Sequence, residues 1–406
     1  MNEAPARQAI AGIAPEARLL LVGRALRAFT DGFVAILLPA YLLALGLGTW
    51  EVGLISTATL LGSALMTLAL GSWGHRFHQR SLLLVAALLM AATGLALAGM
   101  TSFWPLLLVA FVGTMNPSSG DVSIFLPLEH ARLAEAAHGD LRTSLFARYS
   151  LTGALCAAVG ALATGVPDWL GGFGIDRLVA LRGMFVLYGA VGLLIFALYR
   201  RLPEPQAHEK TLPPTPLGPS RDIVFKLAAL FSLDAFAGGL VVNTLLALWL
   251  FERFGLSLSA AGSFFFWAGM LTATSQLAAP WVANRIGLLN TMVFTHIPAN
   301  ICLILAALAP EIEWALALLL LRSLLSQMDV PTRSAFVMAV VTPAERAAAA
   351  SFTAVPRSLA AAASPAIGGA LFAAGWFAAP LLACGVLKII YDLAIWRAFR
   401  RVKPQQ

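Results

Sequence analysis

Charged side chains are scarce in this sequence of 406 residues. Asp, Glu, Lys and Arg make up only 12% of the chain, and hydrophobic residues make up 59%. Soluble domains carry about 25% charged residues, so a chain this apolar could not cover its surface with polar groups in water. The composition therefore excludes a soluble globular protein and indicates a chain whose solvent is the lipid bilayer.

Cysteine is also rare. Cys156, Cys302 and Cys384 each fall inside an apolar stretch, and none belongs to a CxxC pair. A disulfide framework and a zinc site are therefore not expected. His296 and Asn300 lie one helical turn apart, but a metal site would need more ligands close by. Because HExxH, Walker and Cys–His patterns are missing as well, we expect no enzymatic activity, no cofactor and no metal.

The net charge of +7 is spread over short segments between apolar runs rather than gathered in one patch. This pattern is typical of membrane orientation, not of a nucleic-acid partner. With an even number of spans, one side holds most of the Lys and Arg, and the opposite loops hold little more than Arg177, Arg182 and Arg253. The asymmetry predicts a multi-pass protein of a bacterial inner membrane with both termini in the cytoplasm. Residues 1–16 lack the features of a signal peptide.

Twelve apolar segments follow one another, and each is long enough to span a bilayer with some tilt. They cover residues 18–46, 52–73, 81–101, 103–127, 144–165, 179–199, 224–251, 258–280, 290–309, 314–337, 348–373 and 377–397. The longest polar interruption, 200–226, combines charges with several prolines and so favours a linker. We predict an N-terminal six-helix bundle over 1–199, a cytoplasmic linker over 200–223 and a C-terminal six-helix bundle over 224–406.

An internal repeat appears at a shift of 209 residues. The shift superposes Gly46-Leu47-Gly48 on Gly255-Leu256-Ser257, Arg148 on Arg357, and Gly160-Ala161-Leu162 on Gly369-Ala370-Leu371. One offset that holds in separate regions indicates a tandem duplication. Parallel repeats of this kind place a substrate cavity between the two halves. The predicted fold class is thus an all-α membrane protein with twelve transmembrane helices in two pseudo-symmetric six-helix bundles.

The loop between the second and third segments adds a motif. It reads Gly71-Ser72-Trp73-Gly74-His75-Arg76-Phe77-His78-Gln79-Arg80. With the twelve segments, the linker and the repeat, this loop resembles the major facilitator superfamily, whose motif reads roughly G-x-L-A/G-D-R/K-x-G-R-R/K. Gly71, Gly74, Arg76 and Arg80 match, whereas His75 stands at the Asp position. The corresponding loop of the second half keeps Arg285.

The resemblance implies a monomeric secondary transporter that binds a small molecule and works by alternating access. In the superfamily this loop locks the cytoplasmic side of the outward-facing state, because basic side chains at helix ends pair with carboxylates. We expect Glu129 to be the partner of Arg76 or Arg80. His75 leaves two interpretations, a pH-sensitive lock or a gating loop without a pH role. A loose Gly and Pro pattern over residues 153–167 favours the antiporter branch and export.

Ionisable residues at membrane depth are costly and are therefore candidates for function. Arg24, Arg27 and Asp31 share one face of the first segment, and Asp234 lies in the corresponding region of the seventh segment once a small gap is allowed. Asp31 and Asp234 could carry a proton or attract a cationic substrate. Alternatively, Asp31 forms a static pair with Arg27.

Further charges lie in the second half. Arg322 and Asp329 fall on one polar stripe of the tenth segment, where Pro331 can kink the helix. Arg148 and Arg357 are symmetric under the repeat; they could clamp an anion or neutralise Asp121 and Asp329.

Two functions therefore compete. The first is proton-coupled export of a small organic, amphiphilic or cationic solute through Asp31 and Asp234. The second is transport of an organic anion by the buried arginines, namely Arg27, Arg148, Arg322 and Arg357.

Overall fold

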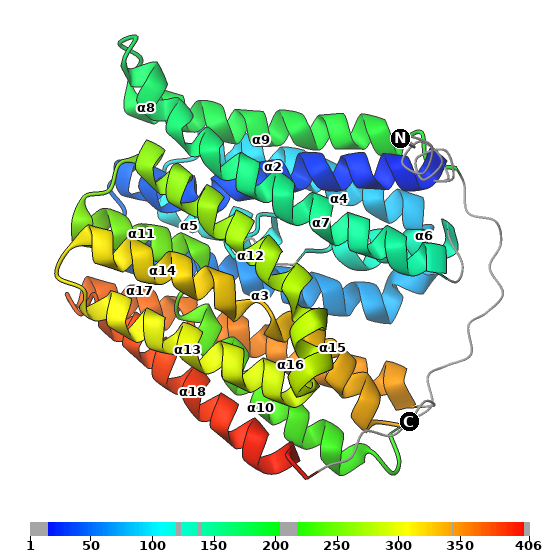
Figure 1. The fold of residues 1–406 in the computed structure, drawn as a ribbon. Helices are drawn as coiled ribbons and strands as arrows, with labels where there is room; N and C mark the ends of the chain where they lie inside the picture. Colours follow the sequence, from blue (N-terminus) through cyan, green and yellow to red (C-terminus); the bar gives the residue numbers. More distant parts are fainter. Residues whose placement is uncertain (1–14, 119–122, 137–139, 204–216, 343–344, 402–406) are drawn as a thin grey trace, which may run out of the picture.

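The structure is a computed structural model that describes residues 15–118, 123–136, 140–203, 217–342 and 345–401. Within these residues the secondary structure is entirely helical, and Figure 1 shows long helices that run roughly side by side. The all-helical prediction is confirmed.

We use "N-terminal half" for the helices before the linker and "C-terminal half" for those after it. The N-terminal half contains α2 (Pro15–Ala44), α3 (Thr49–Trp73), η1 (Gly74–Arg76), α4 (Gln79–Gly99), α5 (Phe103–Val112), α6 (Phe125–Ala136), α7 (Asp140–Leu162), η2 (Ala163–Gly165), α8 (Val166–Gly171) and α9 (Arg177–Tyr199). The C-terminal half contains α10 (Arg221–Gly239), α11 (Asn243–Phe254), α12 (Leu258–Ile286), α13 (Leu288–Leu308), α14 (Ile312–Ser326), α15 (Asp329–Val340), α16 (Arg346–Ala363), α17 (Pro365–Ala373) and α18 (Ala379–Phe399).

Each predicted apolar segment coincides with one helix or with two consecutive helices. By length and apolarity alone, eight helical stretches among the described residues could cross a membrane, and α5 is a shorter apolar helix. The segments 103–127, 224–251, 314–337 and 348–373 are each broken near the middle into two helices.

Proline explains several of these breaks. Pro117 follows the end of α5, and proline lacks a backbone N–H and biases the residue before it away from helical geometry. Pro365 is at the start of α17, where the missing N–H costs nothing. Pro331 lies in the first turn of α15, directly after the interruption at Gln327. The kink expected at Pro331 is therefore present as a full break.

The two halves meet at one end of the bundle. We call the end where α2 begins and α9 ends the linker face (Figure 1). At the opposite face α3 packs against α17 and α7 against α12. A Cβ on Gly53 would lie 2.8 Å from the Cα of Gly369, so only glycine permits this approach. The amide of Ala366 also donates a hydrogen bond of 2.9 Å to Thr57.

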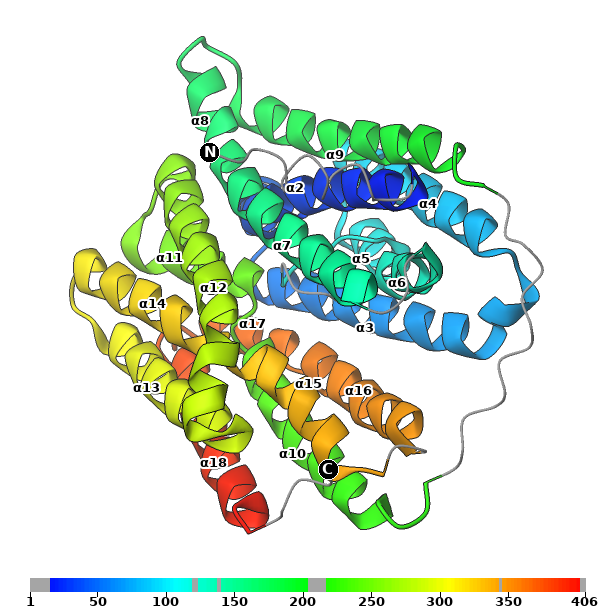
Figure 2. The ribbon, with the colours of Figure 1, turned by 45° about the vertical axis from the view of Figure 1, so that its right-hand side comes forward.

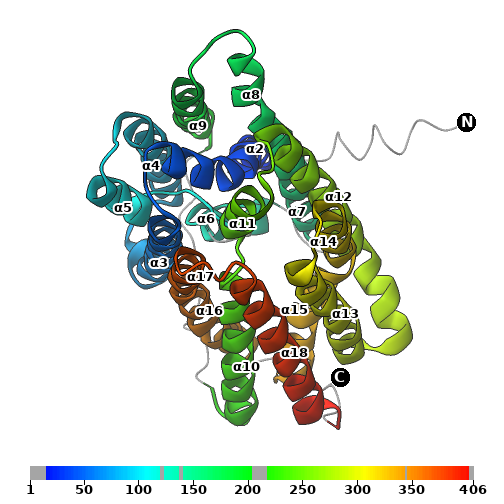
Figure 3. The ribbon, with the colours of Figure 1, turned by 90° about the vertical axis from the view of Figure 1, so that its left-hand side faces the viewer.

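The contacts between halves follow the repeat of 209 residues. The shift relates Gly53 to Gly262 and Gly160 to Gly369. Gly53 lies against Gly369, and Gly262 lies against the carbonyl of Ala161, the residue after Gly160. The hydroxyl of Thr244 donates to the carbonyl of Ala35 over 2.8 Å, and these two positions also differ by 209. A contact between equivalent positions requires the pseudo-two-fold axis to pass between them. Figure 3 shows α2 and α11 together where the two helix clusters meet.

Candidate functional site

A central cavity of about 730 Å³ lies between the halves. Its walls come from α2 and α7 on one side and from α11, α12, α14, α15 and α16 on the other. The deep end reaches Leu246 and Phe264, and the lining extends to the exposed side chains of Ser334 and Arg357 toward the linker face. Figure 2 shows α3 and α7 diverging there from α15 and α16. The volume is that of a pocket for a small organic molecule.

Four ionisable side chains line this cavity among the described residues. They are Arg24 and Asp31 of α2, Arg322 of α14 and Arg357 of α16. Arg24 and Asp31 are buried, Arg322 is partly buried and Arg357 is exposed to the cavity. With three arginines and one carboxylate, the lining carries a formal excess of positive charge.

Asp31 has one carboxylate oxygen, Oδ1, that is buried and without a hydrogen-bond partner in the part of the chain that the structure describes. The side chain is only 6% exposed. A buried acceptor without a partner is costly, so such a group in a cavity indicates a binding position for a ligand or a proton. The predicted pair of Asp31 with Arg27 is wrong, because Arg27 has another partner.

That partner is Glu129 of α6. The guanidinium of Arg27 donates to both carboxylate oxygens of Glu129, over 2.5 and 2.8 Å. The hydroxyls of Tyr149 and Tyr199 donate to the same carboxylate. Arg27 and Glu129 are almost fully buried and do not line the cavity. The expectation that Glu129 pairs with Arg76 or Arg80 is therefore wrong, since helix packing turns Glu129 inward to Arg27.

Asp234 does not line the cavity either. Its carboxylate accepts from Lys388 over 2.6 Å and forms an ion pair of 3.2 Å with Arg333. Arg333 also pairs with Asp329, four residues earlier on α15. The proposed neutralisation of Asp329 by Arg357 is therefore wrong, and Arg333 does this instead. Asp121 lies outside the described residues.

The other predicted arginines separate into two groups. Arg322 and Arg357 line the cavity, and the Nε of Arg322 is buried without a hydrogen-bond acceptor among the described residues. Arg148, on α7, is not among the lining residues. The symmetric Arg148 and Arg357 therefore do not face each other across the cavity.

The predicted gating loop lies at the linker face. Gly71 is exposed and lies two residues before the end of α3, and Gly74, His75 and Arg76 form η1. The guanidinium of Arg80 donates to the carbonyl of Arg200 over 2.6 Å, within the same half. In the second half, Arg285 stacks on Trp281 with its guanidinium carbon 3.8 Å from the ring centre. The side chain of His75 is outside the description, so its role stays a prediction.

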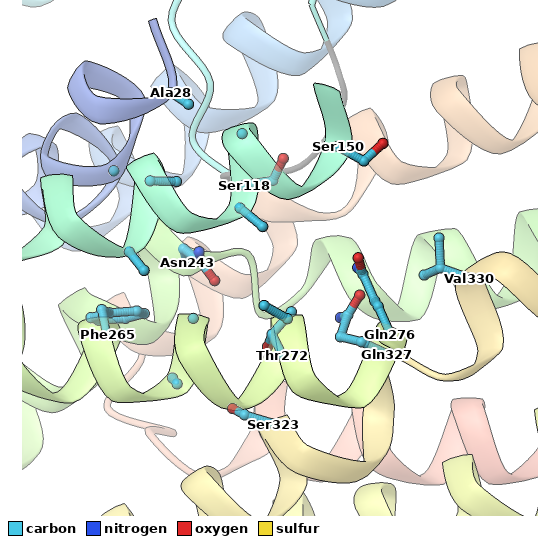
Figure 4. A pocket seen from close by; sticks show the side chains of 18 of the residues that line it. Ala28, Ser118, Ser150, Asn243, Phe265, Thr272, Gln276, Ser323, Gln327 and Val330 are labelled. Carbon is cyan, nitrogen blue, oxygen red and sulfur yellow. The ribbon is translucent and has the colours of Figure 1, made fainter. Parts of the chain in front are cut away.

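Uncharged polar residues complete the cavity, and the sequence reasoning missed them. Figure 4 shows Thr272 and Gln276 of α12 pointing toward the α7 wall that carries Ser150. Ser323 and Gln327 lie on the α14 side of the same cavity. The signal was present as spacing, because each of these pairs is four residues apart and so shares a helix face.

A twelve-segment, two-fold repeated helical bundle with a central polar cavity defines a membrane transporter. The sequence pattern of the Major Facilitator Superfamily matches residues 20–328. The chain belongs to this family, whose members are secondary transporters of small molecules and not enzymes.

Individual proteins agree with this assignment. An uncharacterized membrane protein of Saccharomyces cerevisiae, YJR124C, is 22% identical over 362 residues, which are 80% of this chain and 81% of the yeast protein. A bacterial homolog of the human lysosomal transporter Spinster, in an inward-facing and occupied conformation, matches 96% of this chain and 98% of its own with a TM-score of 0.75 and 16% identity. The nucleoside transporter NupG matches 95% of this chain and 100% of its own, with a TM-score of 0.72 and 16% identity.

Proposed function

We propose that the protein transports a small organic anion by alternating access, with Arg322 and Arg357 as the groups that attract it. The observation that carries this proposal is the charge of the cavity, where three arginines and one aspartate meet. Arg322 is partly buried and its Nε has no hydrogen-bond acceptor among the described residues, which favours a ligand that brings its own negative charge.

Asp31 supports proton coupling in the same cycle. A proton on Oδ1 of Asp31 would satisfy an acceptor that has no hydrogen-bond partner among the described residues, and the cavity gives Asp31 access to water and to substrate. Asp31 carries a proton in one state and releases it in the other. Because Asp31 stands among arginines, loss of its proton weakens the attraction of the cavity for an anion.

A second candidate is the export of a cationic or amphiphilic solute in exchange for protons. Asp31 favours this candidate, because a carboxylate attracts a cation. Among the described residues, no other acidic side chain lines the cavity. The excess of arginine makes this candidate weaker than the anion. Asp234 no longer supports it, because Lys388 and Arg333 already neutralise that carboxylate.

The proposed direction of transport and the proposed membrane location are based on sequence features. The asymmetry of basic residues supports a bacterial inner membrane with the linker face in the cytoplasm. In that orientation the cavity is open to the cytoplasm, which is compatible with loading a solute for export.

The test is a thermal-shift screen on the purified protein. A panel of organic anions is compared with cations and neutral solutes of matched size, and the hits are followed as flux into or out of proteoliposomes. We expect stabilisation by anions, and loss of flux in Arg322→Gln and Arg357→Gln. Arg253→Gln is the matched control, because Arg253 is exposed and does not line the cavity.

The outcome also separates the two candidates. If only cations stabilise the protein and Arg322→Gln transports normally, the anion proposal is wrong and the cation exporter replaces it. Flux with an imposed pH gradient then tests proton coupling. Coupling requires that the gradient accelerates flux in the wild type and does not accelerate it in Asp31→Asn.

A further inference from the structure

The C-terminal half contains a buried polar cluster away from the cavity. His296 and Asn300 of α13 face Asp392 of α18, next to Asp234, Asp329, Arg333 and Lys388. None of these residues lines the cavity. His296 is 3% exposed and Asp392 is 1% exposed, so the transport site described above does not use this pair.

The geometry of the pair is well defined. The Nδ1 of His296 lies 2.9 Å from Oδ1 of Asp392, and the amide of Asn300 donates to Oδ2 of the same carboxylate over 3.4 Å. Lys388 precedes Asp392 by four residues on α18, a spacing that favours a pair between them. Lys388 instead contacts Asp234, so Asp392 has no lysine or arginine partner among the described residues.

A charge count follows from these contacts. Asp234, Asp329 and Asp392 supply three negative charges when ionised, while Arg333 and Lys388 supply only two positive charges. An uncompensated buried charge is very costly. Asp392 pairs with neither of these two cations among the described residues, and its side-chain hydrogen bonds there go to His296 and Asn300. The bond between His296 and Asp392 is therefore the position for a proton that offsets its charge.

Charges on the surrounding helices do not replace that proton. Besides α18, the helices α12, α14 and α15 pack against α13. On α15 the charged groups are Asp329 and Arg333, already counted. Arg322 of α14 and Arg357 of α16 line the cavity. Arg357 interacts electrostatically with Arg333, Asp234 and Asp329, but neither arginine pairs with Asp392 among the described residues. On α12 Arg285 stacks on Trp281.

We propose that His296 and Asp392 form a proton-binding site of the C-terminal half, separate from Asp31. Loss of the proton leaves a negative charge on Asp392 that acts on Asp234, the carboxylate that pairs with Arg333. Because α15 carries both Arg333 and the cavity residues Val330, Pro331 and Ser334, the proton can influence the cavity wall. The inference does not depend on the nature of the substrate.

The test uses neutral variants of the pair in the purified, full-length protein. His296→Gln leaves Asp392 ionised without a proton donor, and we expect its melting temperature to fall by several degrees. Adding Asp392→Asn removes the surplus negative charge, so the double variant should recover most of that loss. If the pair were only a hydrogen bond, the double variant would be no more stable than His296→Gln, and that result overturns the proposal.

Titration gives the second measurement. A proton that the folded pair holds and the unfolded chain releases more readily makes the melting temperature of the wild type fall as the pH rises. The double variant should show a flatter profile, since the linked proton is gone. His78→Gln, at an exposed position, is the matched control and should keep the wild-type slope. An unchanged slope in the double variant would contradict the proposal.

Discussion

In the N-terminal half Asp31 faces the cavity with an unpartnered carboxylate oxygen, whereas in the C-terminal half Asp234 is held between Lys388 and Arg333. The repeat explains the difference. At a shift of 209 residues Asp31 corresponds to Leu240, six residues beyond Asp234, so the two carboxylates lie at different depths by about 9 Å of helix rise. Duplication therefore preserved the scaffold of the two halves, while their charges took different positions and different roles.

Exchange of each carboxylate for its amide tests this contrast most directly. Asp31→Asn should reduce transport by about 100-fold or more, as expected for a group that transfers a proton, with little change in stability. Asp234→Asn should instead destabilise the fold, because Lys388 and Arg333 lose a buried partner, at a cost of about 3–5 kcal/mol. Flux in proteoliposomes and unfolding of the purified protein measure the two effects. The proposed difference between Asp31 and Asp234 is wrong if both variants lose only transport or both lose only stability.

Glu129 tests whether the N-terminal half has a structural cluster of its own. Glu129→Gln leaves Arg27 buried without its carboxylate, and we expect a loss of about 3 kcal/mol in the free energy of unfolding. Chemical unfolding of the purified protein measures it. Glu51→Gln is the control, since Glu51 only caps the exposed start of α3. Equal stability of both variants would mean that the Arg27 contact is unimportant.

The glycine contacts at the opposite face test the symmetry between the halves. Gly53→Val and the equivalent Gly262→Val should each push α3 or α12 away from the other half, and overpacking costs about 1–3 kcal/mol. The equilibrium should shift toward a state closed at the linker face. Spin labels at Ser150 and Ser334 would then move closer together. Gly183→Ala, where a Cβ meets open space, should leave their distance unchanged.

The smallest effect concerns the ends of the linker. The N-terminal half binds linker carbonyls through arginines, Arg80 to Arg200 and Arg132 to Pro203. The C-terminal half binds linker amides through Glu345, which accepts from the backbone of Gly218 and Ser220. Hydrogen bonds from Ser220, Thr342 and Gly218 lower the pKa of Glu345 to about 2, from an ordinary value of 4.5.

The direction of the pH dependence of stability follows from the lowered pKa of Glu345. The unfolded chain binds a proton at Glu345 more readily, so the contribution of Glu345 to stability is present above about pH 4.5. It is lost as the pH falls toward about 2. Glu345→Gln should mimic that loss at neutral pH, seen as faster hydrogen exchange at the amides of Gly218 and Ser220. Unchanged exchange would show that Glu345 does not hold this end of the linker.

Hydropathy was sufficient to predict the fold, because the bilayer demands long apolar helices whatever their partners. The structure then shows that Ala35 and Thr244, which are equivalent under the 209-residue shift, meet at the axis. Ion pairs were harder to predict. Arg27 and Glu129 are 102 residues apart, and their pairing depends on how α2 and α6 pack. Helical periodicity correctly placed Arg24 and Asp31 on one face, but it could not show that Arg27 turns away from that face.

Every ion pair among the described residues joins two groups of the same half. Contacts between the halves are glycine approaches and hydrogen bonds such as those from Thr244 and from Ser259 to Asp168. Such contacts are screened very little by dissolved ions, in contrast to surface charge pairs. The balance between the two access states should therefore be nearly independent of ionic strength, and a cell could change its internal salt concentration without biasing the transporter toward one side of the membrane.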